Sequence, residues 1–93
     1  MKPIRRTRTD LTQKIIVEAL MKAGWFVWVI GWPCDLLCWK QSKGWRTLEC
    51  KSRRKKDGTI ALRSDQQEQG TFCSLTKTPY AVTPEEAIEA LER

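Results

Sequence analysis

The chain of 93 residues has room for one domain, and its 41% hydrophobic and 30% charged content is typical of a globular protein rather than a disordered one. Seventeen Lys and Arg against eleven Asp and Glu give a formal charge of +6, which favours a polyanionic partner such as DNA. The absence of His excludes Ser-His-Asp triads, Cys-His hydrolases and metal sites built on His.

Two further absences bear on location and cofactors. The chain has no apolar run long enough to span a membrane, and no apolar signal core follows its basic N-terminus. It has no GxxxxGK[ST] loop, so we expect no nucleotide cofactor. Four Cys without a signal peptide indicate free thiols, so we expect a cytoplasmic protein, in a host cell if the chain is phage-encoded.

The first half of the chain is predicted to form a helix followed by three strands. Residues 1–8 are basic and predict a flexible arm that precedes a domain of residues 9–93. Residues 10–23 have helical apolar spacing, with Asp10 and Gln13 as a capping box and Gly24 as the stop. The segments 25–30, 34–39 and 45–51 are strands, and the last two form a hairpin because their loop is short and contains Gly.

The second half adds a helix, a short strand and a last helix. Ser64, with Gln67 in a second capping box, begins a helix that runs to about residue 75, and residues 79–82 form a strand. A helical crossover before that strand would make it parallel to its neighbour. Thr83 caps the last helix, with Pro84 first and Glu86 third. The prediction is an α/β domain with one mixed sheet, in the order αβββαβα.

Three polar residues on the predicted hairpin suggest a hydrolytic site. Glu49 and Lys51 are two residues apart, so they share one face of a strand, and the hairpin brings Asp35 beside them. Two carboxylates can hold Mg²⁺ that activates a water, and a Lys can orient that water or stabilise the transition state. The alternative is an exposed ion pair of Glu49 and Lys51 beside a turn carboxylate.

The order of motifs along the chain resembles the PD-(D/E)xK nuclease superfamily, and within it the minimal, phage-type VRR-NUC domains. The resemblance rests on segments that read GWPCDLL at 31–37, LECK at 48–51 and LRSDQ at 62–66. It extends to the first helix and to the final strand and EEA helix. The chain departs from the pattern at Cys34, between the Pro and the Asp, and at Cys50 within E-x-K. Both thiols are expected to pack on the apolar side of their strands.

The resemblance implies a restriction-endonuclease-like fold and a metal-dependent DNA endonuclease, with a flap, a junction or a nick as candidate target structures. Mg²⁺, with Mn²⁺ as substitute, would be bound by Asp35, Glu49 and the backbone carbonyl of Cys50. Lys51 would be catalytic, and Gln66 would contact the site or the scissile phosphate. Asp10 or Gln13 would complete the metal shell, a role that competes with their capping box.

Basic residues suggest where DNA would lie. Arg53, Arg54, Lys55 and Lys56 follow the predicted catalytic strand directly, so a loop there could bind phosphates beside the cut. A mobile surface loop is the alternative. Lys2, Arg5, Arg6 and Arg8 form a second cluster, either an arm along the DNA backbone or a segment without function. We also assign Gln13 to the DNA-facing set.

Five Trp in so short a chain exceed what one small core can hold. They lie on or beside the strands, at positions 25, 28, 32, 39 and 45. Alternate residues of 25–30 face opposite sides of a sheet, so part of this apolar surface must lie outside the core. We therefore expect a homodimer that buries part of the sheet, with base stacking as the alternative.

Two other functions stay open at this stage. Cys34, Cys38, Cys50 and Cys73 could form a zinc site of a small regulator, although no CxxC pair is present. A DNA-binding module without catalysis would bind but not cleave. An acid pair facing phosphates is of no use to such a module, which favours the enzyme.

Overall fold

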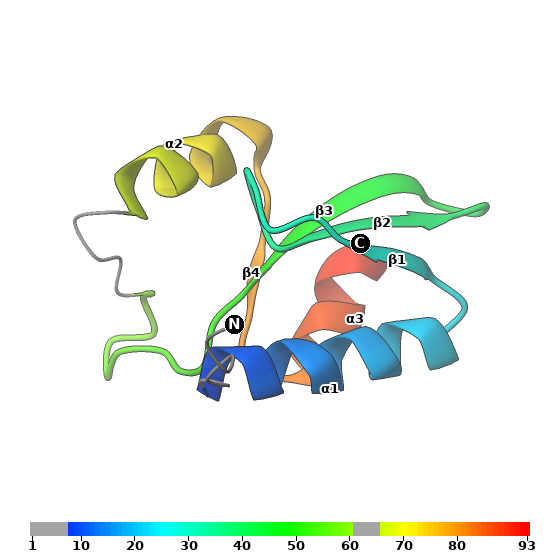
Figure 1. Ribbon diagram of the computed structural model, residues 1–93, viewed down its shortest axis with the longest axis horizontal. Coiled ribbons are helices and arrows are strands. Elements are labelled where there is room, and N and C mark those ends of the chain that lie inside the picture. The colour runs from blue at the N-terminus through cyan, green and yellow to red at the C-terminus, as the bar shows by residue number, and fades with distance from the viewer. Residues whose placement is uncertain (1–7, 61–65) are drawn as a thin grey trace, which may run out of the picture.

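The computed structural model describes residues 8–60 and 66–93, which form a mixed four-stranded sheet with helices on both sides (Figure 1). The elements in chain order are α1 (Arg8–Lys22), β1 (Phe26–Val29), β2 (Leu36–Lys40), β3 (Gly44–Cys50), α2 (Gln67–Thr76), β4 (Tyr80–Ala81) and α3 (Pro84–Glu92). The predicted α/β class is confirmed. None of the helices in the described ranges is long and apolar enough to cross a membrane.

Helix α1 begins earlier than the apolar periodicity indicates. Its first residue is Arg8, so Asp10 lies inside the first turn and the prediction that Asp10 caps the helix is wrong. Apolar spacing reports only the buried face, and residues 8 and 9 precede the first apolar residue. The predicted stop at Gly24 is confirmed, because Gly24 has φ +96° and a Schellman pair of hydrogen bonds follows it. In that pair the Gly24 N–H donates to Met21 O at 3.1 Å and the Trp25 N–H to Leu20 O at 3.0 Å.

The strands lie in the order β1-β2-β3-β4. The first three are antiparallel neighbours, and the predicted hairpin of β2 and β3 is confirmed, with Leu36 opposite Leu48 and Trp39 opposite Trp45. Strand β4 is parallel to β3, with Glu49 opposite Tyr80. A parallel partner needs a crossover, and the chain makes it through α2, as the sequence predicts.

The core lies on one face of the sheet. Helices α1 and α3 pack against each other and against this face, whereas α2 stands apart on the other side (Figure 1). Alternate residues of β2 and β3 point into the core, where the helices meet them with small and aliphatic side chains. The buried set includes Ile16, Leu20, Trp25, Leu36, Cys38, Leu48, Cys50, Ala81, Ala87 and Leu91.

The starts of the last two helices differ in how well the sequence predicts them. The Thr83 side chain accepts a hydrogen bond from the Glu86 N–H at 3.1 Å and Pro84 is the first helical residue, which confirms the prediction. The described part of α2 begins at Gln67, with Gln66 in the N-cap position and no capping bond from its side chain. Ser64, the predicted cap, lies outside the described residues.

The other face of β1–β3 carries an exposed aromatic cluster, which consists of Phe26, Trp28, Trp39 and Trp45. Residues directly opposite each other in neighbouring strands share a face, and the register places Phe26 against Trp39 and Trp39 against Trp45. The ring centroids of neighbouring members lie 5.6 to 6.5 Å apart. Phe26, Trp28 and Trp45 are 60%, 45% and 59% exposed, so the cluster is a surface rather than a second core.

Candidate active site

The predicted acid pair lies where β2 and β3 cease to be hydrogen-bonded to each other. The last regular pair is Leu36 with Leu48, and beyond it the two segments are linked by hydrogen bonds from backbone N–H groups to side chains. The Asp35 N–H donates to Glu49 Oε1 at 2.9 Å, and the Cys50 N–H donates to Asp35 Oδ2 at 2.8 Å. Each carboxylate therefore binds the backbone of the other strand, and the two acidic side chains are held side by side as the hairpin predicts.

The Asp35 backbone is fixed from the other direction as well. Its carbonyl accepts the N–H groups of Ile30 at 3.0 Å and Gly31 at 3.3 Å, so the turn after β1 clamps it. Gly31 has φ +75°, which glycine adopts without strain. The N–H, the carbonyl and one side-chain oxygen of Asp35 are thus all hydrogen-bonded, which gives its carboxylate a defined direction.

Glu49 and Lys51 point away from the core, as strand alternation predicts. Their N–H groups donate to Pro79 O and Ala81 O, both at 3.0 Å, which joins this end of β3 to β4. Lys51 Nζ lies 3.4 Å from Glu49 Oε2, and the two side chains are only 12% and 2% exposed. The alternative of an exposed surface ion pair is therefore wrong. The pair is buried, where an ionised carboxylate needs close partners.

Burial governs the electrostatics of Glu49. Burial, the nearby Asp35 charge and a hydrogen bond between the two side chains together raise the pKa of Glu49 from 4.5 to about 7, against the opposing effect of Lys51. A cation bound beside the two acids would favour the ionised form of Glu49, because it would offset the Asp35 charge.

Two residues that the sequence did not assign to the acid pair, Tyr80 and Cys73, complete this environment. Tyr80 is the register partner of Glu49, and Cys73 is buried on α2. Burial, together with the Cys73 and Glu49 groups, raises the pKa of Tyr80 to about 12, and burial raises the pKa of the Cys73 thiol, with the Glu49 charge adding to it. Only the parallel β3–β4 register could have indicated Tyr80, and that register follows from the fold.

The donor set of the acid pair fits a hard divalent cation. The described ranges contain no cluster of three or more His, Cys, Asp or Glu side chains arranged to hold a metal ion. Mg²⁺ often uses one or two carboxylates and keeps several waters, so Asp35 and Glu49 suffice as its charged ligands. The N–H and C=O of one strand residue point to the same side. The Cys50 carbonyl therefore lies on the edge where its N–H meets Asp35.

For the remaining residues that the sequence assigns to the site, the structure gives a position on or beside a helix, which does not by itself define a role at the acid pair. Gln66 lies at the N-cap of α2 and is half-buried, and Gln13 is half-buried on α1. Asp10 lies in the first turn of α1, which contacts β3, but its side chain is outside the described part of the structure. Arg8, predicted to belong to the arm, is the first residue of α1. The roles of these four residues at the site stay predictions.

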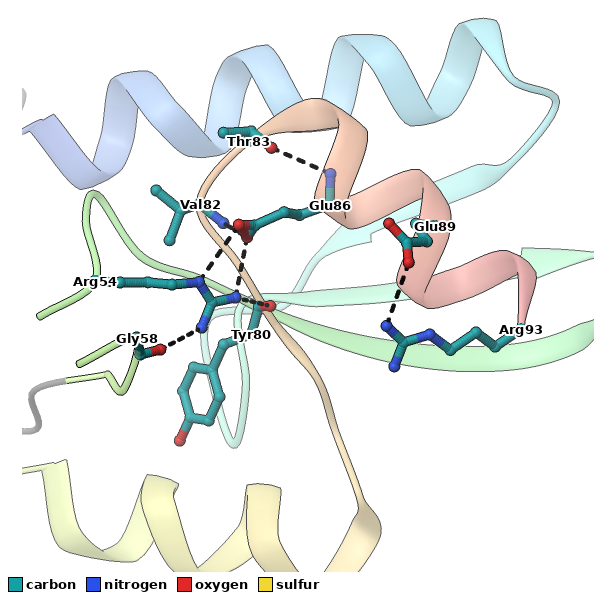
Figure 2. A network of polar contacts seen from close by, with 8 residues as sticks. All are labelled: Arg54, Gly58, Tyr80, Val82, Thr83, Glu86, Glu89 and Arg93. Atoms are coloured by element: carbon teal, nitrogen blue, oxygen red, sulfur yellow. Dashed lines mark hydrogen bonds and ion pairs between the residues drawn. The ribbon is translucent and has the colours of Figure 1, made fainter. Parts of the chain in front are cut away.

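The basic loop of residues 52–59 leaves β3 directly after Lys51. Arg53, Lys55 and Lys56 are exposed on it, and with Arg54 they line a pocket of about 350 Å³. Arg54 differs from its neighbours because its guanidinium forms an ion pair with Glu86 at 3.0 Å (Figure 2). Lys2, Arg5 and Arg6 lie outside the described residues.

Comparison of the chain with protein-family models, with curated proteins and with solved structures found no match. Assignment of function therefore depends on the site itself.

The four Cys, which the sequence offers as an alternative zinc site, are buried free thiols. Burial raises the pKa of Cys38 to about 12, and also raises that of Cys34 and Cys50. Within the described ranges, which include all four Cys, these thiols form no group of three or more with other Cys, His, Asp or Glu side chains that could hold a metal ion, which counts against a zinc site.

Proposed function

We propose that the protein belongs to the class of carboxylate-based, metal-dependent nucleases of PD-(D/E)xK type. The particular activity that we infer is endonucleolytic hydrolysis of phosphodiester bonds in DNA, with Mg²⁺ or Mn²⁺. The observation that carries the proposal is the pair of Asp35, half-buried, and Glu49, buried, each hydrogen-bonded to the backbone beside the other, with Lys51 next to Glu49. A surface ion pair needs none of this construction.

The architecture supports the same proposal. A hairpin that supplies both acids, a crossover helix and a parallel last strand are what a restriction-endonuclease-like fold would require. The core side of β3 is filled by Leu48 and Cys50, so the strand can present Glu49 and Lys51 on its other face without loss of packing. The +6 formal charge agrees with a polyanionic substrate.

Each residue of the proposed site has a separate task. Mg²⁺ bound by the Asp35 and Glu49 carboxylates and the Cys50 carbonyl would lower the pKa of a bound water and stabilise charge on the phosphate. Asp35 is oriented by its backbone contacts, so it offers its carboxylate without rearrangement. Lys51 is held beside Glu49 and can donate a hydrogen bond to the attacking water or to the scissile phosphate.

The test is cleavage of a panel of DNA substrates that includes plasmid, single-stranded, nicked, flap and four-way forms, each with Mg²⁺ or Mn²⁺. EDTA, Asp35→Asn and Glu49→Gln should each abolish cleavage, whereas Glu89→Gln, an exposed acid on α3, should have no effect. Metal binding is measured separately as a rise in melting temperature. A wild-type protein that neither cleaves any substrate nor gains stability from either metal would refute the proposal.

The alternative is a DNA-binding module without catalysis, which the basic loop favours on its own. Such a module would bind DNA with a steep salt dependence but would show no metal-dependent stabilisation. Full DNA binding and no metal effect in wild type, together with loss of binding when Arg53, Lys55 and Lys56 are replaced by Ala, would select this alternative. Metal stabilisation that Asp35→Asn removes would select the nuclease.

We also propose that two copies associate through the aromatic cluster of the sheet. The facing positions Leu37 and Thr47 carry no charge, and interface cores are depleted of charge and rich in aromatic residues. At 150–250 Å² for each full side chain, the exposed fractions of Phe26, Trp28 and Trp45 amount to roughly 250–400 Å² per copy. That is about a third to a half of the area one partner contributes to a standard interface, with rim residues supplying the rest.

A further inference from the structure

The basic loop has a defined shape rather than that of a loose surface segment. The Lys55 N–H donates to Thr59 O at 2.8 Å, and the Gly58 N–H donates to Lys55 O at 2.9 Å, which closes a turn over residues 55–58. Asp57 Oδ1 accepts from the Thr59 N–H at 3.0 Å and from its hydroxyl at 2.7 Å. The tip of the loop is therefore closed on itself, and its position depends on what anchors it to the domain.

Arg54 supplies that anchor (Figure 2). Its guanidinium donates through Nε and Nη2 to the two carboxylate oxygens of Glu86, at 3.4 and 3.0 Å. The same group donates to Tyr80 O and to Gly58 O, both at 3.3 Å. The Arg54 side chain thus connects the loop to strand β4 and to the first turn of α3. Its partner on α3, Glu86, is 32 residues away along the chain.

Glu86 is itself held in place. Its N–H is capped by the Thr83 hydroxyl, and its Oε2 also accepts the Val82 N–H at 3.0 Å. The hydrogen bonds from Arg54 and Val82 hold the pKa of Glu86 below its usual value. Arg54 and Glu86 are 35% and 37% exposed, and a single pair of this exposure contributes little. The bidentate geometry and the three additional backbone contacts make this pair an exception.

We propose that Arg54 is a positioning residue, and that the Arg54–Glu86 pair holds the basic loop in the shape in which Arg53, Lys55 and Lys56 bind DNA phosphates beside the cut. The inference rests on the proposed nuclease function. Arg53 is two residues from Lys51, so its Cα lies within about 7 Å of the Lys51 Cα. The loop that carries the basic residues and their pocket therefore begins next to the candidate site. Its ligand is the phosphodiester backbone of the substrate.

The physical basis is preorganisation. A loop that must be ordered on binding loses conformational entropy at that moment, and this loss is subtracted from the affinity. Arg54 has its charge neutralised by Glu86 and its donors directed at protein oxygens, so it contributes to binding through the positions of its neighbours. The sequence predicts the same role for Arg54 as for Arg53, whereas the contacts of the Arg54 guanidinium with Glu86, Tyr80 and Gly58 distinguish Arg54 in the structure.

The test uses Glu86→Gln, with Glu89→Gln as the matched control. Both variants remove one negative charge from α3, but Glu89 is 73% exposed and, within the described part of the chain, its ion pair is with Arg93 at 3.6 Å (Figure 2). Charge alone predicts that both changes leave DNA binding unchanged or make it tighter. The proposal predicts that Glu86→Gln weakens binding of a short DNA duplex by about fivefold, corresponding to the conformational entropy of about one loop residue. Equal affinities for the two variants would overturn it.

A second variant and a second measurement distinguish loss of the anchor from misfolding and from failure of the nuclease proposal. Arg54→Lys keeps the charge but loses the fork, so it should weaken binding as Glu86→Gln does, whereas a direct phosphate contact would tolerate Lys. Hydrogen exchange of the Lys55 and Gly58 amides should accelerate in both variants, whether or not DNA binds. Unchanged exchange would refute the anchor. Faster exchange in a protein that does not bind DNA at all would refute the proposed function alone.

Discussion

Replacement of Glu49 by Gln should flatten the dependence of folding stability on pH in the absence of metal. Burial beside Asp35 raises the pKa of Glu49 from 4.5 to about 7, so the folded state keeps the proton that the unfolded state has already lost. Between these two values the native state binds more protons, and stability therefore falls as pH rises. The contribution is complete below about pH 4.5 and is lost by the time pH has passed about 7.

The size of this effect follows from the shift in pKa. One pKa unit corresponds to 1.36 kcal/mol, so Glu49 should lower the free energy of unfolding by about 3 kcal/mol between pH 5 and pH 8. The window is informative because the chain has no His, the residue whose ordinary pKa lies within it. The lowered pKa values of Glu86 and Glu92 act with the opposite sign and at lower pH.

Urea denaturation at several pH values across this window measures the effect directly. The proteins to compare are wild type, Glu49→Gln and the control Glu89→Gln, all in EDTA. Wild type and Glu89→Gln should lose stability as pH rises, and Glu49→Gln should stay within about 0.5 kcal/mol. Mg²⁺ should restore stability to wild type at the upper end and not to Glu49→Gln. A flat profile for wild type, or an equal slope for Glu49→Gln, would show that Glu49 is not held as the structure indicates.

Three other predictions concern catalysis, assembly and backbone conformation. Lys51→Met should reduce DNA cleavage by at least about a hundredfold while metal still raises the melting temperature, and full activity in this variant would remove Lys51 from the mechanism. Trp28→Glu should convert a dimer to a monomer in analytical ultracentrifugation without change in circular dichroism, whereas a dimer that persists would exclude the aromatic cluster as its interface. Gly24→Ala should lower the free energy of unfolding by about 1–2 kcal/mol because φ is +96° there, whereas the added Cβ would meet Lys40 Cε only at 3.6 Å, an ordinary van der Waals contact. Equal stability of the Gly24→Ala protein in urea would count against the Schellman ending of α1.

Much of the site was predictable because strand alternation is a local property. Glu49 and Lys51 share a face and Leu48 and Cys50 share the other, as their spacing indicates. The proximity of Asp35 followed from a short Gly-containing loop that could only be a hairpin. The end of α1 at Gly24 and the cap of α3 at Thr83 were equally local, since each depends on one residue type at one position.

What the sequence could not disclose depends on segments far apart in the chain. Tyr80 and Cys73 lie near Glu49 only because the crossover through α2 brings them there. Arg54 stands in a run of four similar cations, and only its contact with Glu86 distinguishes it from them. The start of α1 was misjudged because residues outside the apolar pattern can still be helical. The restriction-endonuclease-like fold and the DNA substrate stay proposals.

The parallel pairing of β3 with β4 has a consequence for the order of folding. Strands β1, β2 and β3 follow one another through short turns, so they can pair early, whereas the β3–β4 ladder must wait for a distant segment. The N–H groups of Glu49 and Lys51 belong to that late ladder. Before it closes, Glu49 lacks Tyr80 beside it and is an ordinary ionised carboxylate. A partly synthesised chain therefore contains the acid pair without the buried setting in which the pair would bind metal.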